Sequence, residues 1–364
     1  MYIADSTIDQ MVAQILDHAQ GKTSSLLVGE HSSFNMEELI DALNAAGARF
    51  LGGIFPKVIH DNTIYETGIV QNTFENVEEI FTVKHLDTGD FTIPEFHRET
   101  GREYTLITYV DGLTQVKSAY LLELYNRFGA DVNYVGGGAG SLSLEQMPCV
   151  FTHEGIFQDA AVCGLVAMDV SLAVRHGWEK IAGPFIATRT KGNVVQELNW
   201  RNAFEVYKEV VEARSGKTFT DSNFFDIAKG HPFGIVREHT ERIVRDPLAV
   251  NEKGHLICIG EVEENTFLDI LEGENENLIA AARTAVEESL AKAAAPKKAV
   301  IIDCISRGLF LEEDIQKELD GVVGPLKAKN PDISISGALT LGEISSFGQG
   351  LIQLFNKTIV IGIF

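Results

Sequence analysis

Three side chains of this 364-residue sequence have the types and positions expected of a small-molecule site. Cys304 and Arg307 directly follow the apolar run 299–302, and Glu343 follows a glycine-containing turn at 336–342. The guanidinium of an arginine is a rigid fork of donors that suits a carboxylate, and a glutamate accepts hydrogen bonds from an ammonium group. Arg307 and Glu343 could therefore bracket a zwitterion. Alternatively, the two side chains form a structural salt bridge.

Cys304 has two interpretations. It lies three residues before Arg307, and a neighbouring positive charge lowers the pKa of a thiol and makes it nucleophilic. The alternative is a small core residue, because free cysteines are among the most buried residue types. The sequence has no GxSxG motif and no conspicuous pair of carboxylates, so we predict no catalytic residue.

Glycines could bring backbone N–H groups close to a ligand in two places. The densest cluster contains Gly136, Gly137, Gly138 and Gly140, and the second place contains Gly342. The cluster lacks the lysine and hydroxyl residues of a phosphate-binding loop, and it does not fit a dinucleotide-binding fingerprint. The alternative is that these glycines serve tight turning and close packing.

One histidine stands out from the others. His176 precedes Gly177 and Trp178 after an apolar run, so it is the candidate for a haem ligand; the alternative is a packing corner. The four cysteines show no CxxC spacing, and no HxH or HExxH motif occurs. We therefore predict no metal site.

Three stretches of the chain repeat the same order of elements. Each begins with a continuous apolar run, typical of a strand buried on both faces. An amphipathic helix, a second apolar run, a glycine-rich turn and a further strand follow. Units of this kind predict parallel strands joined by right-handed crossovers. The predicted first strands are 25–29, 104–110 and 299–303, and the predicted helices are 36–46, 116–128 and 312–319.

A long insertion separates the second unit from the third. It contains a predicted hairpin at 184–198, helices at 202–213 and 278–294, and a strand at 256–262. A polar break at 214–220 divides the chain, so we predict two domains, 22–218 and 219–364. The predicted fold class is α/β with mixed sheets. Repeated β-α-β-β units form two related subdomains, with a hairpin and helix insertion between units two and three.

The composition is acidic, with 30 Lys and Arg against 52 Asp and Glu and a formal net charge of −22. Nucleic acids and anionic lipids bind basic surfaces, so we expect neither as a partner. No apolar run approaches the roughly 18 residues that span a bilayer, and the first residues lack the features of a secretory signal. We therefore expect a cytoplasmic protein. The acidic segment 261–277 is interpreted as a solvated face, with a docking surface as the alternative.

These features together resemble the FIST family (F-box and intracellular signal transduction proteins), with its N- and C-terminal FIST domains. The resemblance extends from residue 22 to the end, and the order and spacing of several motifs carry it. The motifs are YVGGGAG at 134–140, VRHGW at 174–178, ELNWRNA at 197–203, CISRGLF at 304–310, SGALTLGE at 336–343 and NKTIV at 356–360.

The resemblance implies an intracellular sensory module for small molecules such as amino acids, with a pocket at Cys304, Arg307, Glu343 and the glycine cluster. It also implies that the signal passes in trans to a histidine kinase, a chemoreceptor or a cyclic-dinucleotide enzyme. Some family members are haem proteins that sense nitric oxide. We therefore predict a cytoplasmic, non-enzymatic sensor of an amino acid or similar metabolite. The alternatives are a haem-binding nitric oxide sensor using His176 and a cysteine-dependent enzyme.

Overall fold

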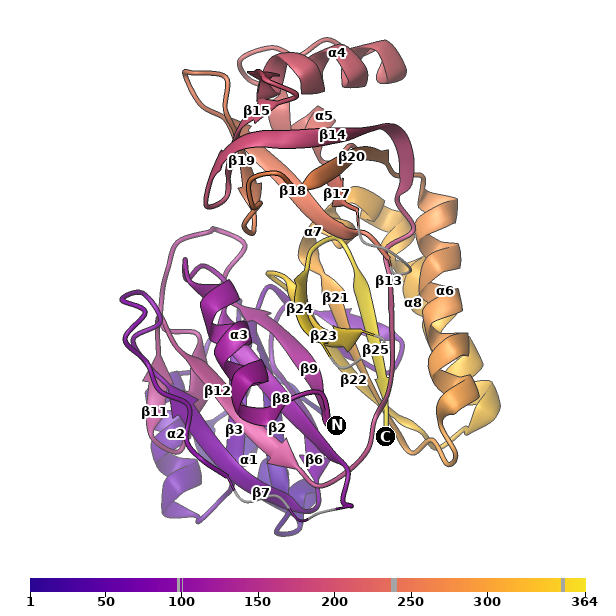
Figure 1. Ribbon diagram of the computed structural model, residues 1–364. Helices are drawn as coiled ribbons and strands as arrows, with labels where there is room; N and C mark the ends of the chain where they lie inside the picture. The colour runs from indigo at the N-terminus through magenta and orange to yellow at the C-terminus, as the bar shows by residue number, and fades with distance from the viewer. Residues whose placement is uncertain (97–98, 100, 237–240, 348–350) are drawn as a thin grey trace.

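The computed structural model describes residues 1–96, 99, 101–236, 241–347 and 351–364. The molecule has two parts (Figure 1). The core contains three six-stranded sheets, and the lobe above it is built on one seven-stranded sheet. The predicted α/β class with mixed sheets is confirmed.

The three core sheets take their strands from widely separated segments. In order across the sheet, the first contains β1 (Tyr2–Ile3), β6 (Ile69–Phe74), β2 (Thr23–Gly29), β3 (Phe50–Phe55), β10 (Val150–Thr152) and β11 (Gly155–Phe157). The second contains β7 (Val77–Val83), β12 (Ala161–Val166), β8 (Tyr104–Asp111), β9 (Val132–Ala139), β23 (Glu343–Phe347) and β24 (Leu351–Phe355). The third contains β13 (Ser171–Arg175), β25 (Ile359–Ile363), β21 (Lys298–Cys304), β22 (Ser334–Thr340), β4 (Lys57–His60) and β5 (Thr63–Tyr65).

These three sheets share one arrangement. The central strands β2, β8 and β21 each have a parallel neighbour on one side and an antiparallel neighbour on the other. The hairpin that follows each parallel neighbour leaves its own sheet: β4 pairs with β22, β10 with β3, and β23 with β9. The sheets are therefore linked in a closed ring. β13 occupies the edge position of the third sheet, and the lobe is inserted in the sequence between this strand and β21.

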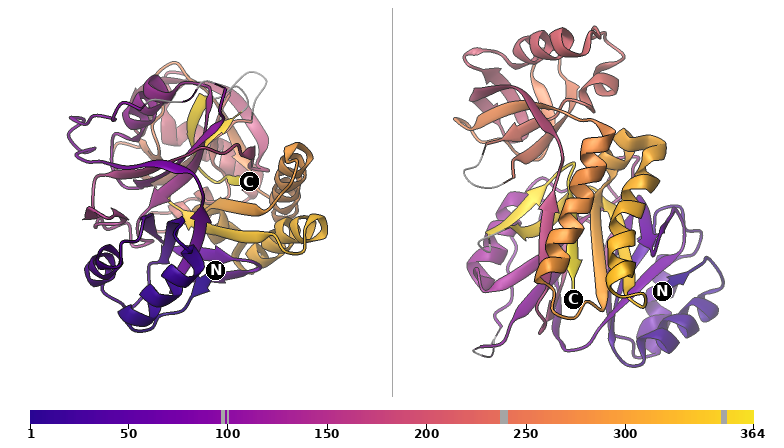
Figure 2. Two further views of the ribbon diagram at one scale, coloured as in Figure 1. Left: turned by 90° about the horizontal axis from the view of Figure 1, so that it is seen from below. Right: turned by 90° about the vertical axis from the view of Figure 1, so that its right-hand side faces the viewer.

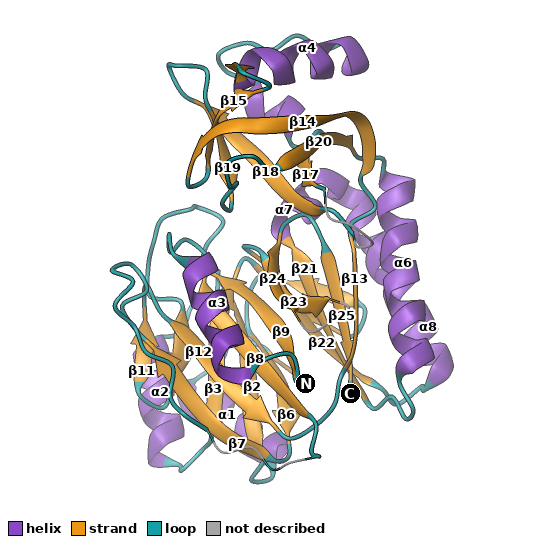
Figure 3. Ribbon diagram, in the orientation of Figure 1, coloured by secondary structure: helices purple, strands orange, loops and turns teal. Residues whose placement is uncertain are grey.

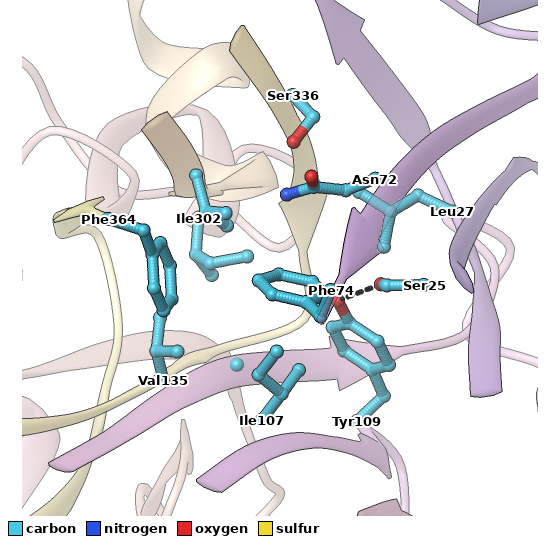
Figure 4. A pocket seen from close by; sticks show the side chains of 12 residues that line it. Ser25, Leu27, Asn72, Phe74, Ile107, Tyr109, Val135, Ile302, Ser336 and Phe364 are labelled. Atoms are coloured by element: carbon cyan, nitrogen blue, oxygen red, sulfur yellow. Dashed lines mark hydrogen bonds between the residues drawn. The ribbon is translucent and has the colours of Figure 1, made fainter. Parts of the chain in front are cut away.

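The three sheets meet in the centre of the core. A cavity of only about 10 Å³ remains there, lined by side chains from β2, β6, β8, β9, β21 and β22 (Figure 4). The hydroxyls of Ser25 and Tyr109 hydrogen-bond at 2.7 Å across it, and the Phe74 ring meets the Phe364 ring edge to face. Such a volume holds one water at most. Room for a larger ligand must therefore lie at the margins of the sheets.

The core helices lie against the sheets (Figure 3). They are α1 (Ile8–Ala19), α2 (Met36–Ala45), α3 (Lys117–Phe128), α6 (Asn275–Lys292), α7 (Ile305–Leu311) and α8 (Ile315–Lys329), with a 3₁₀ turn at Glu312–Asp314. Figure 2 shows α6 and α8 side by side on the third sheet. None of the described helices is both long and apolar enough to cross a membrane.

The predicted helix at 312–319 is wrong in both its start and its end. A short α7 follows β21 directly, and α8 runs on to Lys329 through Gly324 and Pro325, which would be expected to break a helix. The inner face of α8 buries Leu319, Val322, Val323 and Leu326. Burial of this apolar stripe outweighs the weak helix propensity of the glycine and the proline.

The lobe contains, in order across its sheet, β14 (Glu179–Lys191), β20 (Phe267–Glu272), β17 (Phe233–Ile235), β18 (Ile243–Val250), β19 (Leu256–Ile259), β15 (Val194–Leu198) and β16 (Arg201–Asn202). It also carries α4 (Ala203–Ser215) and α5 (Phe224–Ala228). The predicted hairpin is confirmed, since β14 pairs with β15. The strand predicted at 256–262 ends early, because Gly260 adopts φ +84°. The predicted domain boundary after residue 218 falls inside this lobe and stays a prediction.

The acidic segment 261–277 is only partly the solvated face that its composition indicated. Asp269 of β20 is fully buried, and its carboxylate lies 2.7 Å from Lys180 Nζ and 2.8 Å from Arg242 Nε. A buried charge requires such partners. This aspartate therefore holds the lobe together, and the exposed acids flank it.

Candidate functional site

Five polar side chains from distant parts of the chain meet where the lobe rests on the core. They are Asp246, Cys304, Ser306, Glu343 and Lys357, and we call them the polar cluster; each is at most 4% exposed. Asp246 comes from β18 of the lobe. The other four come from the end of β21, the turn between β24 and β25, the start of β23 and the first turn of α7. Three of the motifs quoted above thus converge at one place.

The lobe contributes a buried carboxylate that pairs with a buried ammonium of the core. Lys357 Nζ lies 3.2 Å from the Asp246 carboxylate and donates to Ser306 Oγ and to the Lys229 carbonyl, both at 2.9 Å. The Ser306 hydroxyl donates to the same carboxylate. Trp178 covers the ammonium, with its ring centroid 4.9 Å from Nζ. Because both charges are fully buried, removing either one would leave the other uncompensated.

Cys304 and Glu343, which the sequence singled out, lie in contact with each other. The Glu343 carboxyl accepts from the Thr340 hydroxyl at 3.1 Å and from the Thr358 N–H at 3.2 Å, and it touches the Cys304 thiol. Burial raises the pKa of Glu343 to about 8. Burial, followed by this neighbouring carboxyl, also raises the pKa of the Cys304 thiol well above its ordinary value. A cysteine is activated when the pKa of its thiol is lowered, whereas burial and the neighbouring carboxyl both raise the pKa of Cys304.

The raised pKa of Glu343 makes stability depend on pH in a defined direction. The folded protein keeps the proton to about pH 8, whereas the unfolded chain releases it near pH 4.5. The stabilising contribution is therefore complete below pH 4.5 and is lost as the pH rises to 8, by up to about 1.4 kcal/mol per unit. We expect Glu343→Gln, which mimics the protonated acid, to flatten this slope in urea unfolding measured at pH 5, 6, 7 and 8. The exposed control Glu313→Gln should keep the wild-type slope; an unchanged slope in Glu343→Gln would refute the assignment.

Arg307, the third residue of the sequence-predicted pocket, is bound to another carboxylate. Its Nε donates to both oxygens of Glu318 at 3.0 Å, and Nη2 donates to Glu318 Oε2 at 2.5 Å. Its remaining bonds go to the carbonyls of His176 and Leu278. Arg307 is 0% and Glu318 1% exposed. Arg307 therefore ties α7 to α8, and its predicted role in bracketing a zwitterion with Glu343 stays a prediction.

The predicted glycine cluster lies in a strand and not in a turn. Gly136, Gly137 and Gly138 belong to β9, and Gly140 follows it. A Cβ at Gly136 would lie 1.7 Å from a backbone oxygen of β8, and one at Gly138 would lie 2.5 Å from the Leu341 carbonyl oxygen. The Gly138 N–H donates to the Gly342 carbonyl at 2.8 Å. In this structure the absence of side chains lets β9 approach its neighbours closely; ligand binding by these glycines stays a prediction.

His176 does not fit a haem ligand. It is 4% exposed, its Nδ1 accepts from the Trp178 N–H at 2.8 Å, and its Nε2 lies 2.9 Å from a Glu241 carboxylate oxygen. The first bond places the ring proton on Nε2, facing the carboxylate. An iron atom would need one of these nitrogens, so the haem would have to displace a buried partner. The residues present favour a packing corner instead.

A cleft runs between the lobe and the core beside the carboxyl end of β8. One part, which we call the β8 cavity, has a volume of about 540 Å³ and is lined by Gly112–Ser118 without Val116, by Lys191–Asn193, by Leu248, by Cys258–Glu261 and by Leu354. The adjoining part, the α3 groove, has a volume of about 390 Å³ and shares Ser118, Glu261 and Leu354 with it. Ligands of parallel α/β sheets bind at such strand ends, and the volume suits a small metabolite.

Two polar side chains in the wall of the β8 cavity keep hydrogen-bonding capacity that no described group of the protein uses. Thr114 is 1% exposed, and its hydroxyl has no hydrogen-bond partner among the described residues. Lys117 Nζ donates to the carbonyls of Gly112 and Thr114, both at 2.7 Å, which leaves one of its three N–H donors. Burial lowers the pKa of Lys117 to about 8, against the opposing effect of Asp111 and then Glu261. The ammonium is therefore mostly charged at neutral pH.

Sequence reasoning missed this cavity. Thr114 and Lys117 come shortly after the end of β8, but their types are ordinary for a turn and for the first residue of a helix. Glu261 belongs to the lobe, about 150 residues away in the chain. No local sequence pattern predicts that these side chains line one cavity.

Comparison with known proteins agrees with this architecture. No curated relative matches the chain. The family model of the FIST N domain matches residues 27–201, and that of the FIST C domain matches residues 203–346. The two matches adjoin within the lobe and together cover most of the chain. The protein therefore belongs to the FIST family, whose domains are sensory domains of signal transduction.

Proposed function

We propose that this protein is a cytoplasmic sensor that binds a zwitterionic metabolite, such as an amino acid, in the β8 cavity and passes the signal to a partner in trans. The observation that carries the proposal is the unpaired, buried hydroxyl of Thr114 beside the remaining donor of Lys117. A buried hydroxyl without a partner is costly to the protein. A ligand carboxylate would accept from both groups.

The opposite wall of the cavity supplies groups that suit the ammonium and the side chain of the ligand. The carboxylate of Glu261 comes from the lobe and suits a ligand ammonium, and the apolar side chains of Leu248, Ile259 and Leu354 suit a ligand side chain. The ligand would therefore contact the core through its carboxylate and the lobe through its ammonium. Binding in this way favours one placement of the lobe on the core, which is how a ligand shifts a conformational equilibrium.

A thermal-shift screen of amino acids and related metabolites tests the proposal. We expect at least one ligand to raise the Tm of the wild type, because a ligand that binds only the folded state stabilises it. Lys117→Met keeps the length of the side chain and removes the charge, and we expect it to weaken binding by about tenfold or more. Lys208→Met, on α4 and outside the lining of the cavity, is the control and should respond as the wild type does. Equal responses from Lys117→Met and the wild type, or no ligand in the screen, would contradict the proposal.

A further inference from the structure

We infer that the α3 groove is the docking site of the output partner, and that it takes an amphipathic helix with a basic polar face. The inference rests on the proposed sensory function, because it identifies the surface through which the sensor would contact its output partner. The groove lies between α3, β24 and the lobe, with Leu121 and Tyr125 on one wall and Ile352 on another.

The groove carries exposed apolar side chains. Leu122 is 60% exposed and Leu351 is 50% exposed, and both line it. Single exposed leucines are common on soluble proteins. Two that flank one groove of about 390 Å³ form an apolar surface of the kind that interfaces use.

The occupant is a helix and not an added strand. β24 is the edge strand of the second sheet, so its free side could in principle pair with another strand. However, Nη1 of Arg245 from the lobe donates to the Leu354 carbonyl at 3.2 Å, and Nε of the same residue donates to the Glu261 carbonyl at 2.9 Å. The lobe thus takes an acceptor of that edge. The side chains of α3 and β24 that line the groove form a surface that would receive a helix with apolar residues at i, i+3, i+4 and i+7.

The negative charge of the α3 groove favours a basic partner over a second copy of this acidic chain as the occupant. The carboxylates of Glu261 and Glu263 line the groove, and the whole chain carries −22. The arginine in the wall, Arg245, is only 7% exposed and is bound to carbonyl oxygens. Like charges oppose self-association at this surface, whereas a basic helix is attracted to it.

The wall that the α3 groove and the β8 cavity share couples docking of the helix to binding of the ligand. Ser118, Glu261 and Leu354 line both the α3 groove and the β8 cavity. A ligand that positions these residues changes the affinity of the groove, and by linkage the docked helix changes the affinity for the ligand by the same factor. Ligand binding in the β8 cavity and helix docking in the α3 groove are therefore energetically coupled.

The test uses the full chain and a fluorescent peptide of roughly 18 residues, five helical turns, with leucines at the spacing given above and lysines elsewhere. A scramble of the same composition and a version with glutamates for lysines are the reference peptides. By fluorescence anisotropy, we expect the lysine peptide to bind at least tenfold more tightly than either. Leu122→Ser combined with Leu351→Ser should lose about tenfold in affinity, and Glu263→Lys should lose several-fold. Leu144→Ser removes a leucine that is 51% exposed elsewhere, and it should bind as the wild type does.

Equal binding of the scrambled peptide, or unchanged affinity of the double variant with its Tm preserved, would overturn the inference. Analytical ultracentrifugation provides the second arm: a dimer that the double variant dissociates would show that the occupant is a second copy. The ligand found by thermal shift is measured on the same variants. If the double variant keeps ligand binding and peptide affinity, the docking site is wrong while the sensor stands. If no ligand binds the wild type but the double variant loses peptide affinity as expected, the docking site stands while the proposed sensor function is wrong.

Discussion

Residues 22–218 and residues 219–364, produced as separate chains, are each expected to lack a cooperative unfolding transition. The first fragment retains β13, β4 and β5, which belong to the third sheet, but lacks the central β21. The second retains β21, β22 and β25 but lacks those three flanking strands, and its β23 and β24 lose β9 as a partner. The lobe is divided as well, since β14 and β15 separate from β20 and β19.

The physical reason is that each fragment exposes apolar surface which the missing strands cover in the whole chain. Isolated two-stranded ribbons are marginally stable at best, and β22 left with an open side is prone to aggregate. Circular dichroism and thermal unfolding of the two fragments test this. Co-production of residues 219–364 with residues 1–218, a first fragment that also keeps β1 and α1, should restore a folded complex, because the closed ring of sheets and the helix that covers the first sheet are then available. A fragment that unfolds cooperatively on its own would show that the exchanged hairpins are not required.

Arg307→Met is expected to destabilise the protein by about 3–5 kcal/mol, because it leaves the carboxylate of Glu318 buried without its partner. Urea unfolding at constant pH measures the change. The double variant Arg307→Met with Glu318→Leu should recover much of the loss, since the carboxylate that binds Arg307 through three hydrogen bonds is then removed together with it.

An exposed ion pair provides the matched control. Arg201 and Glu209 have side chains 50% and 60% exposed, and Arg201→Met should leave the free energy of unfolding close to that of the wild type. If Arg307→Met costs as little as this control, the ion pair does not hold α7 and α8 together. If the double variant is no more stable than Arg307→Met, the loss does not come from the unpaired Glu318.

Local patterns were sufficient to predict the first strand of each unit and the helices of the first two units. Continuous apolar runs correctly placed β2, β8 and β21, because strands covered on both faces need apolar side chains throughout. Spacing of 3.6 residues placed α2, α3 and α4 within one or two residues. The position of β13 at the edge of the third sheet was not predicted, because the lobe separates this strand from β21 in the sequence.

The exchange of hairpins and the cleft could not be predicted in the same way. β4 and β23 are short, and nothing in their sequences specifies whether they pair with a nearby or a distant strand. The partner of Arg307 was also hidden. The helix that carries Glu318 was predicted to end at residue 319, and Glu343 was the more conspicuous acid. Cys304 and Glu343 lie together because β21 and β22 are parallel neighbours and their carboxyl ends share one edge; a ligand pocket at these residues stays a prediction.

The central claim is that a zwitterion binds between Thr114 and Lys117 of the core and Glu261 of the lobe. A crystal structure of the full chain, grown with the ligand identified by thermal shift, tests this claim most directly. We predict that the ligand carboxylate lies within hydrogen-bond distance of Thr114 Oγ1 and Lys117 Nζ, and that its ammonium faces Glu261. A ligand bound instead at Cys304 and Glu343, with the β8 cavity empty, would contradict the account.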